Sequence, residues 1–567
     1  MRFNTLKLPL SFLLILISTG LAFTQSANVP LNEDYYHLLD RYEIKQRVFS
    51  TDFFSNFKPY GRQGIAQFLD SLPENTSISA ADEFNLNYLK LDNWEFTDYE
   101  GRYSKKPVLK NIYKYQNDFY AHHGESFDVH LSPVFYFGLG QDDNSGSTPF
   151  INTRGAEIRG IIDDKIAFYT YLGENQAVFP EYVQSWNSRY NVVPGEGFWK
   201  RYGDHGFDYF SVRGYVNFNA TKHIGIQLGY DKNVIGSGQR SMLLSDFSSS
   251  YPFLKLNVQV WKLQYQVMYA QMIADQFYVA NGGGSLGTKE YPKKFMTMHQ
   301  LSINLSDNFT LGFFESIIFN KEDSLGNSRF ELNYLNPIIF YTAIEQQAGS
   351  ADNVVLGMDA RWNIAGSYQL YGQFLFDEFV LSEVFSGDGW WSNKYGFQLG
   401  GKYIDVLNIP NLDLQLEYNF SRPYTYAHNN LQTSYSNYRQ PLAHPIGANL
   451  KEFMAVLRYQ PINRLTLMGR LISANYGEDR PGENWGKNVL LDYTTYEQEY
   501  GNVTGQGVAT DLFMTQLVAS YQWRHNLFTD LTFTYRNEEN ELLAGTEPTS
   551  FIQFAIRLNA PRINHLF

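Results

Sequence analysis

The chain is 567 residues long, carries a net charge of −13 at pH 7 and contains no cysteine, while 17% of its residues are aromatic. The acidic balance argues against nucleic-acid binding, which needs a basic surface. The absence of cysteine excludes disulfides, thiol chemistry and cysteine-bound metal sites. After the N-terminus no stretch holds 18 consecutive apolar residues, so the sequence predicts no transmembrane helix.

The first 24 residues have the organisation of a secretory signal peptide. Arg2 and Lys7 supply positive charge, residues 8–17 form an apolar run, and residues 22–24 offer a cleavage site with small side chains. The apolar run is too short to span a bilayer comfortably. We therefore predict that residues 1–24 are a cleaved export signal.

Residues 25–110 show a helical period. The apolar residues that fall on one helical face are Ile65, Phe68, Leu69 and Leu72. Residues 35–48 and 80–91 also read as helices, and Ser79 is a candidate N-cap for the second. We predict a small periplasmic helical bundle, with a disordered leader as the alternative.

From residue 111 to residue 567 the dominant pattern is an alternation of apolar and polar residues. In residues 412–420 every even position is apolar and every odd position polar. Side chains of a strand point to opposite faces with period two, so one face meets lipid and the other water. About eighteen such stretches, the first near Ser126, predict an all-β transmembrane barrel of antiparallel strands. The chain ends in a strand-like stretch and a terminal phenylalanine.

The strand count follows from connections that alternate between long and short. Short connections are predicted at residues 163–165, 221–222, 261–262, 306–308, 365–366, 406–410, 461–464 and 524–526. Long connections are predicted near residues 139–151, 174–206, 232–252, 273–294, 320–352, 381–392, 421–450, 475–511 and 537–549. Nine long and eight short connections join eighteen strands, and this even number places both ends in the periplasm and the long loops outside the cell.

Charged residues within the strands should face the lumen, because a cation at the lipid midplane costs about 2–4 kcal/mol. The predicted lumen charges include Arg213, Asp359, Arg361 and Asp377. Glu315 is ambiguous, because Phe309, Leu311 and Phe313 would place it on the lipid face. We predict that Glu315 faces inward, through either a bulge or a reversed strand face. We expect the lumen charges to pair across the barrel.

Aromatic residues in the long loops are candidates for stacking on sugar rings. They are Trp186, Trp199, Trp390, Trp391, Tyr424 and Tyr426. The alternative is that they belong to the aromatic girdles of a barrel, and it is strongest for the Trp390–Trp391 pair.

Residues 236–241 lack the GxxxxGK[ST] pattern of a phosphate-binding loop, so we predict a loop that folds back over the barrel mouth. In it, Arg240 pairs either with acidic sugar groups or with Asp246.

Catalysis has weaker support. The acidic residues Glu315, Glu345, Asp352, Asp359 and Asp377 suggest a glycosidase-like set, but charged lumen pairs explain them better. The sequence has no HExxH or GxSxG motif, and we predict no metal or cofactor.

Several motifs resemble one known family in order and spacing. They are residues 236–246, the Tyr-Pro-Phe-Leu stretch at 251–254, residues 312–316, residues 335–337 with Glu345, residues 352–353, residues 371–373 with Asp377, and residues 422–428. Together with the helical stretch 58–72 they resemble the capsule assembly Wzi family of outer-membrane proteins. RemB-type gliding-motility barrels are also similar. The resemblance implies an eighteen-stranded barrel with a small periplasmic helical bundle that holds capsular polysaccharide at the cell surface.

We therefore expect a non-catalytic barrel in the outer membrane whose partners are surface polysaccharide and outer-membrane lipid. Two alternatives stay open: a gliding-motility or adhesin barrel, with gliding or export machinery proteins as partners, and a diffusion porin, since eighteen strands are wide enough for a pore. An outer-membrane hydrolase is a more distant alternative.

Overall fold

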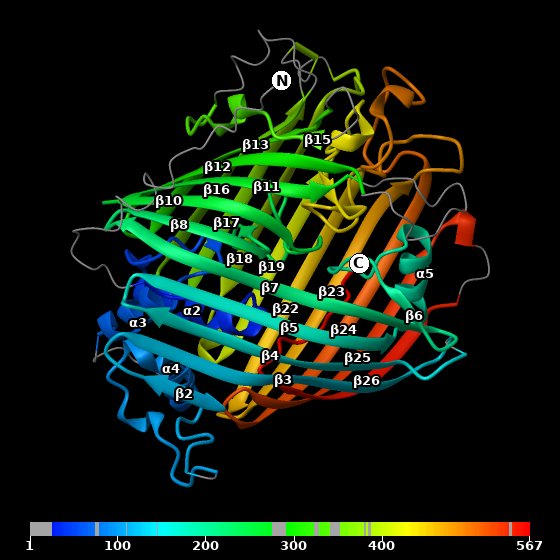
Figure 1. The fold of residues 1–567 in the computed structure, drawn as a ribbon. Coiled ribbons are helices and arrows are strands. Elements are labelled where there is room, and N and C mark those ends of the chain that lie inside the picture. The colour runs from blue at the N-terminus through cyan, green and yellow to red at the C-terminus, as the bar shows by residue number, and fades with distance from the viewer. Residues whose placement is uncertain are drawn as a thin grey trace, which may run out of the picture.

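The fold is a closed antiparallel β-barrel with a helical N-terminal segment (Figure 1). The structure is a computed structural model that describes residues 25–73, 79–108, 110–144, 146–274, 291–322, 328–340, 352–378, 382–383, 387–543 and 547–567. Residues 1–24 and Glu345 lie outside the described residues, so the structure gives no outcome for the export signal or for Glu345.

Eighteen long strands form the barrel wall, as the alternation in the sequence predicted. They are β3 (Phe127–Asp142), β4 (Phe150–Ile162), β5 (Ile166–Val178), β7 (Gly206–Thr221), β8 (Ile224–Asp231), β10 (Tyr251–Val260), β11 (Leu263–Ile273), β12 (Lys293–Ser306), β13 (Phe309–Phe319), β16 (Asn353–Ile364), β17 (Tyr368–Glu378), β18 (Lys394–Tyr403), β19 (Leu412–Ser421), β22 (Leu450–Ile462), β23 (Leu465–Glu478), β24 (Val508–Arg524), β25 (Leu527–Glu539) and β26 (Thr549–Leu558).

Shorter strands lie beside the wall or within the loops. They are β1 (Phe57–Lys58), β2 (Tyr120–His123), β6 (Lys200–Tyr202), β9 (Val234–Ile235), β14 (Lys321–Glu322), β15 (Ser328–Arg329), β20 (Ser436–Asn437) and β21 (Gln440–Pro441). The α-helices among the described residues are α2 (Glu33–Gln46), α3 (Arg62–Ser71), α4 (Ala80–Asp92) and α5 (Glu181–Tyr190). None of the helices in the described part of the chain has the length and apolar character needed to cross a bilayer.

The ring closes between the last and the first long strand, where Phe551 lies opposite Asp142 and Leu558 opposite Phe135. The eight short connections predicted from the sequence lie where neighbouring strands meet, for example residues 163–165 between β4 and β5. We call the end of the barrel that carries them the short-turn end, and the opposite end the long-loop end. The eighteen-strand prediction is confirmed.

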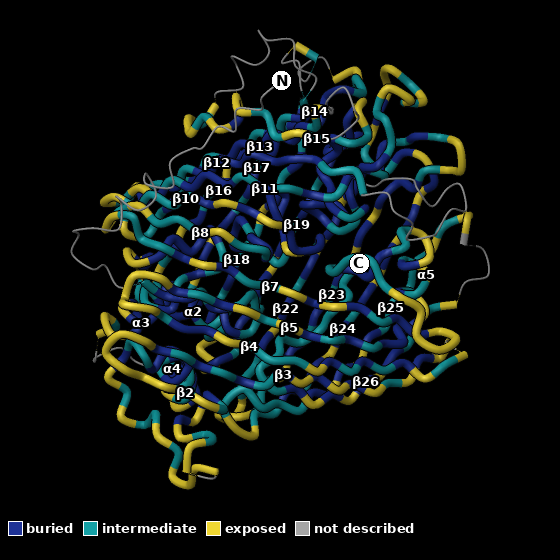
Figure 2. The backbone as a smooth tube through the Cα atoms, viewed as in Figure 1, coloured by how far each residue is buried: buried dark blue, intermediate teal, exposed yellow. Residues whose placement is uncertain are grey.

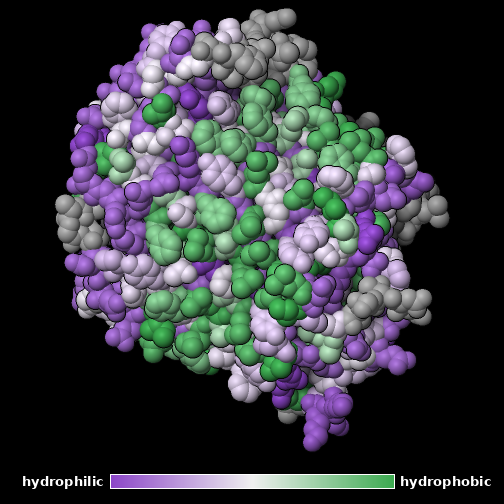
Figure 3. Space-filling view, turned by 180° about the vertical axis from the view of Figure 1, so that it is seen from behind, coloured by the Kyte–Doolittle hydropathy of each residue, from purple (hydrophilic) through white to green (hydrophobic). Residues whose placement is uncertain are grey.

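The outward face of the wall is apolar. Exposed large hydrophobic residues on β16–β26 include Met358, Leu370, Leu399, Leu457, Leu517 and Phe554. From behind, green hydrophobic residues gather in a band that crosses the molecule obliquely, with purple residues at its margins (Figure 3). Such a band between polar rims is the surface that a bilayer requires of a barrel.

Local signals define the N-terminal helices. The Ser79 side chain accepts a hydrogen bond from the backbone N–H of Asp82, and the Asp82 carboxylate accepts one from the backbone N–H of Ser79, so α4 begins with a capping box. In α2, Asn32 caps the first turn. The helices lie at the short-turn end (Figure 1), and α2 packs inside the barrel, where most of its residues are buried (Figure 2).

Ion pairs that join α2 to α4 and to the wall fill the part of the lumen near the short-turn end, which we call the lower lumen. The Arg41 guanidinium contacts Asp82 of α4 at 2.7 Å and also binds Asp413 and Asp405. Other pairs of this kind are Glu33 with Arg470 and Arg458, Asp40 with Lys402, and Glu43 with Arg361. Arg361, predicted to pair across the barrel, therefore takes its partner from the N-terminal segment, because α2 occupies the space between the walls.

The part of the lumen near the long-loop end, which we call the upper lumen, has an apolar core. The alternation of apolar and polar residues in the sequence did not predict it. Inward residues of β11–β17, including Met268, Met298, Phe314 and Leu375, are fully buried against Leu243, Tyr426, Leu442 and Val489 of the long loops. The loop between β8 and β10 turns into the barrel, and its strand β9 pairs with β1 there. Both faces of these strands are thus apolar, one toward lipid and one toward the loops.

The chain does not end in a strand, contrary to the prediction. After β26 ends at Leu558, the backbone N–H of Asn559 bonds Asn526 at the short-turn end. Residues 559–567, which we call the tail, then return through the lumen. Phe567 is buried beside Trp186 and Tyr182, and its backbone oxygen accepts a hydrogen bond from Arg536 at 3.0 Å. These contacts belong to side chains near the long-loop end, so the tail spans the lumen.

Glu315 does not face the lumen, and this prediction was wrong. It lies opposite Leu356, which shares its face with the exposed Met358, and no bulge interrupts the pairing of β13 with β16. Glu315 is nevertheless fully buried, because residues near Phe340 fold over this part of the outer wall and the Phe340 N–H donates to its carboxylate at 2.8 Å. A covering loop, and no change of strand face, keeps this charge out of lipid.

Replacing Arg41 tests whether ion pairs hold the helical segment in the barrel. We expect Arg41→Gln to weaken the docking of this segment by about 3–5 kcal/mol, because Asp82, Asp405 and Asp413 lose the one buried guanidinium that they share, and Lys45 still pairs with only the first two. Limited proteolysis should then cut the segment faster. Arg47→Gln is the control, since Arg47 is exposed and bonds a backbone carbonyl. Equal cleavage rates for both variants would contradict this role for Arg41.

Candidate functional site

Trp186 and Trp199 lie in the long loop between β5 and β7, as predicted, but both pack into the protein. Trp186, on α5, contacts Tyr190 with 4.6 Å between ring centroids and Phe567 with 5.4 Å. Trp199 packs edge-on against Phe207 at 4.5 Å. Both indoles are partly buried in one apolar cluster. They hold the loop and the tail together and offer little ring face to a ligand.

Tyr424 and Tyr426 have no exposed surface, so the prediction that they stack on an external sugar is wrong. The Tyr424 hydroxyl donates to the backbone oxygen of Asn484 at 2.9 Å. Tyr426 stacks on Tyr435 and donates to the backbone oxygen of Met242 at 2.8 Å. These tyrosines tie three long loops together from within.

A partly exposed aromatic surface remains around Trp390 and Trp391. The Trp391 ring stacks on Tyr496 with 4.8 Å between centroids and lies 5.0 Å from Tyr493. We call Trp390, Trp391, Tyr493 and Tyr496 the aromatic platform. All four are half-buried and come from the loops that follow β17 and β23. The backbone N–H of Trp391 bonds Glu499, so the two loops are joined.

The Arg240 side chain is buried and does not pair with Asp246. Its guanidinium contacts both carboxylate oxygens of Glu452, at 3.2 and 2.8 Å, and the backbone oxygen of Leu566 at 2.6 Å. The surrounding loop also differs from the prediction of a flap over the mouth, because it descends into the lumen, where Gly236 bonds Asn56 at 2.8 Å. Arg240 therefore fastens the loop and the tail to the wall.

The predicted lumen charges on the other strands do face inward. Asp359 accepts hydrogen bonds from Asn56 and Gln300, and the Asp377 carboxylate accepts the backbone N–H of Tyr426 at 2.6 Å. Each carboxylate thus positions a segment inside the barrel. Within the described part of the chain, no cluster of three or more metal-ligating side chains is present.

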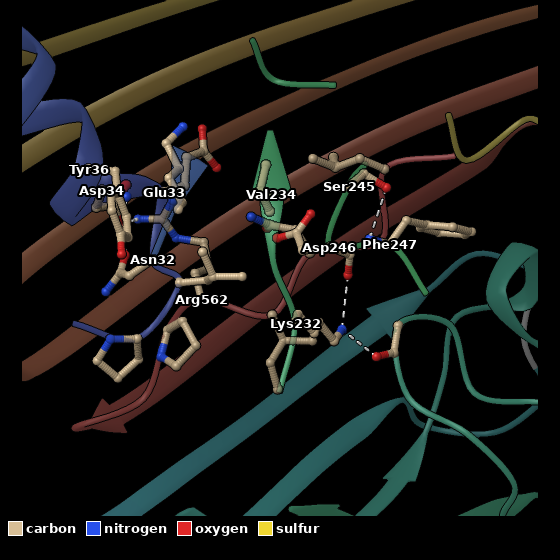
Figure 4. A pocket seen from close by; sticks show the side chains of 18 of the residues that line it. Asn32, Glu33, Asp34, Tyr36, Lys232, Val234, Ser245, Asp246, Phe247 and Arg562 are labelled. Carbon is tan, nitrogen blue, oxygen red and sulfur yellow. Dashed lines mark hydrogen bonds and ion pairs between the residues drawn. The ribbon is translucent and has the colours of Figure 1, made fainter. Parts of the chain in front are cut away.

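A cavity of about 410 Å³ lies between the wall formed by β4, β5 and β7 and the segments that pack inside the barrel, which are α2, the loop between β8 and β10, and the tail. We call it the lumen chamber (Figure 4). Figure 4 shows Asn32, Glu33 and Tyr36 on one side of it and Lys232, Asp246 and Phe247 on another. The Lys232 ammonium donates to the backbone oxygens of Gly195 and Asp246. The volume of the lumen chamber is that of a small-molecule site.

Wall residues of the lumen chamber were only partly foreseen. Arg213 was predicted to face the lumen and does, but the neighbouring Tyr171, Tyr209 and Glu196 were not singled out. The sequence signal that could have identified these tyrosines is their place on the polar face of the adjacent strands β5 and β7. A tyrosine that belongs to a lipid-facing girdle would lie on the apolar face. Glu196 lies in a loop without such a period.

The protonation state of Glu33, in α2, depends on the charged groups around it. Burial alone would raise the pKa of Glu33, but the guanidinium groups of Arg470 and Arg458 outweigh it and hold this pKa well below its ordinary value of 4.5. Burial lowers the pKa of Lys58, on β1, to about 8. The docked helix is therefore favoured while Glu33 is ionised.

Comparison with known proteins identifies the family. The profile of the family described as "Capsule assembly protein Wzi" matches residues 163–548, more than half of the chain. The chain belongs to this Wzi family. The resemblance drawn from the loop motifs is thus confirmed. A search of curated proteins found no match.

One solved structure shows the same fold. Wzi of Escherichia coli, an outer-membrane protein involved in group 1 capsule assembly and described as a carbohydrate-binding β-barrel, is 12% identical, with a TM-score of 0.58. The similarity covers 94% of this chain and 100% of that protein. OprD of Pseudomonas aeruginosa is 11% identical over 76% of this chain and 94% of its own, with a TM-score of 0.42. The family match and the fold shared with the Escherichia coli protein together show that this member of the Wzi family is an outer-membrane β-barrel.

Acidification should release the helical segment of this Wzi family member. Because the folded-state pKa of Glu33 is depressed, its ion pairs stabilise the docked state fully above about pH 4.5, and this contribution is lost progressively as the pH falls below that value. The chain lacks cysteine, so a spin label at Val48→Cys, directly after α2, reports the mobility of the segment.

The label should become more mobile between pH 5 and pH 3, and Glu33→Gln should reduce this dependence while making the label more mobile at pH 7. A pH dependence that is unchanged in the Glu33→Gln variant would show that other groups control the docking.

Proposed function

We propose that this protein binds surface polysaccharide and retains it at the cell, without catalysing a reaction. The observation that carries the proposal is the combination of a filled barrel with a partly exposed aromatic platform at the long-loop end, in a chain of the Wzi family. The carbohydrate binding described for the Escherichia coli protein supports it. In this proposal the long loops face the exterior and the helical segment lies on the periplasmic side.

The filled lumen argues against a diffusion porin. The N-terminal helix α2, the loop between β8 and β10 and the tail all pack within the ring of strands. Between them they contact the wall through ion pairs in the lower half and through an apolar core in the upper half. In the part of the chain that the structure describes, these elements leave the lumen a chamber of about 410 Å³, so passage of bulk solutes is disfavoured.

The aromatic platform suits a polymer that repeats the same sugar. Sugar rings have apolar faces that stack on indole and phenol rings, and each contact of this kind is weak. A polymer engages many copies of the protein at once, so weak contacts sum to firm retention. The carboxylates once considered for glycoside hydrolysis, Asp359 and Asp377, are engaged in holding buried segments, which favours binding without chemistry.

Removing the platform rings should release polysaccharide. We expect Trp390→Ala together with Trp391→Ala to weaken retention roughly tenfold, since two stacking contacts contribute about 0.5–1.5 kcal/mol each. Cell-bound and released polysaccharide are measured in the variant strain. Trp261→Ala is the matched control, because Trp261 is 80% exposed on a short turn at the opposite end.

Unchanged retention in a correctly assembled platform variant would defeat the assignment of the platform. If deletion of the protein abolished surface motility and left the polysaccharide in place, the proposed function itself would fail in favour of the gliding alternative.

Electrical recordings test the filled lumen. In planar bilayers we expect the purified protein to show no conductance of the size of an open porin. Replacing residues 236–245 by a short glycine-serine linker should create or enlarge a conductance, because it removes Arg240 and the buried Leu243 and Leu244 from the lumen. A large steady conductance in the unmodified protein would contradict the filled barrel.

A further inference from the structure

Glu196 presents an unpaired carboxylate to the upper part of the lumen chamber. It lies in the loop between β5 and β7, is half-buried and lines the cavity. Among the described residues its side chain forms no hydrogen bond and no ion pair within 4.0 Å. Lumen carboxylates such as Asp359 and Glu452, by contrast, are bonded to neighbouring side chains. Glu196 is therefore available to a ligand.

The backbone around Glu196 is held rigidly. Gln440 accepts a hydrogen bond from the Gly195 N–H at 2.8 Å and donates one to the Glu196 backbone oxygen at 3.0 Å. The Lys232 ammonium binds the Gly195 oxygen from the other side. Val193 and Gly197 close the turn at 2.9 Å. Such a fixed turn presents the carboxylate without a cost for ordering the backbone on binding.

Tyrosine rings and a guanidinium lie on the wall that faces this turn. Tyr171, Tyr209 and Arg213 point inward from β5 and β7 and line the same chamber. The Arg213 guanidinium lies 5.7 Å from the Tyr171 ring centre and 3.9 Å from the Asp231 carboxylate. In the described structure the hydroxyls of Tyr171 and Tyr209 have no hydrogen-bond partner. Donors, acceptors and ring faces therefore converge on one space.

This combination matches the chemistry of a sugar ring. A carboxylate accepts hydrogen bonds from two adjacent hydroxyls, a guanidinium donates to hydroxyl oxygens, and tyrosine rings pack on the apolar face of a pyranose. The chamber, at about 410 Å³, has the volume of a ligand pocket. Asp246, which is exposed, lines it too, so the chamber is accessible to solvent.

We propose that the cluster of Glu196, Tyr171, Tyr209 and Arg213 binds one pyranose unit of the polysaccharide through its adjacent free hydroxyls. The inference rests on the proposed function and adds a second, internal site to the external platform. The platform would hold the polymer along its length, and the Glu196 cluster a single unit that reaches into the barrel from the long-loop end.

The test compares short and long ligands on the purified full-length protein. The probes are the surface polysaccharide extracted from the producing cells and di- to tetrasaccharides released from it by partial hydrolysis, with binding measured by calorimetry. We expect the short probes to bind the unmodified protein and to bind Glu196→Gln at least tenfold more weakly. This substitution keeps the shape of a side chain that supports no fold contact. Tyr209→Phe is the second variant, and Glu181→Gln, an exposed carboxylate on the same loop, is the control.

The platform variant separates the two sites. Trp390→Ala with Trp391→Ala should weaken binding of the long polymer and leave the short probes unaffected. Short probes that bind Glu196→Gln and Tyr209→Phe as well as they bind the unmodified protein would overturn the internal site. Polymer binding without any binding of short probes would overturn it too and leave the proposed function standing. Failure of both probes would overturn the proposed function together with this inference.

Discussion

Neutralising charge inside the lumen is the constraint on which the rest of this barrel depends. Strands that must keep lipid on one side carry their charged side chains on the other, and a buried guanidinium without a partner costs several kcal/mol. The wall brings Arg361, Arg458 and Arg470 into one closed space, and α2 supplies Glu43 and Glu33 to meet them. The helical segment is thus part of the barrel's electrostatic balance.

The same filling determines what the barrel is suited to do. In an open pore the inward face of each strand meets water, and its residues must be polar along the whole height. Here Met268, Met298 and Phe314 face inward and pack against loops, as in the core of a soluble protein. A lumen with its own apolar core is rigid, and rigid loops present side chains in fixed positions. This favours recognition over passage.

The sequence predicted those features that depend on one strand and its neighbours. Alternation placed the strands, turn residues such as 163–165 marked their ends, and Ser79 marked the start of α4. What it could not predict depends on contacts between distant segments. Glu315 keeps an outward position because Phe340 covers it, and Arg240 pairs with Glu452, 212 residues away. Periodicity reports which face a residue occupies and says nothing about what later folds onto that face.

The candidate site shows the same division. Tyr424 and Tyr426 have the composition of a sugar platform and are wholly buried, whereas Trp390 and Trp391 keep exposed ring area. Burial of a loop residue is set by the other loops, so residue type alone cannot separate these cases. The inward tyrosines of β5 and β7 carried a readable signal, because an aromatic residue on the polar face of a barrel strand has no lipid to meet.

The small sheet of β1 and β9 gives the barrel a mechanical property. It joins a segment beside the N-terminal helices to a loop from the opposite end, with Phe57 opposite Ile235 and Gly236 bonded to Asn56 at 2.8 Å. A tension applied to the long loops is therefore transmitted through the interior to α2, whose ion pairs distribute it among β16, β18, β19, β22 and β23. The load is therefore shared by five strands of the wall.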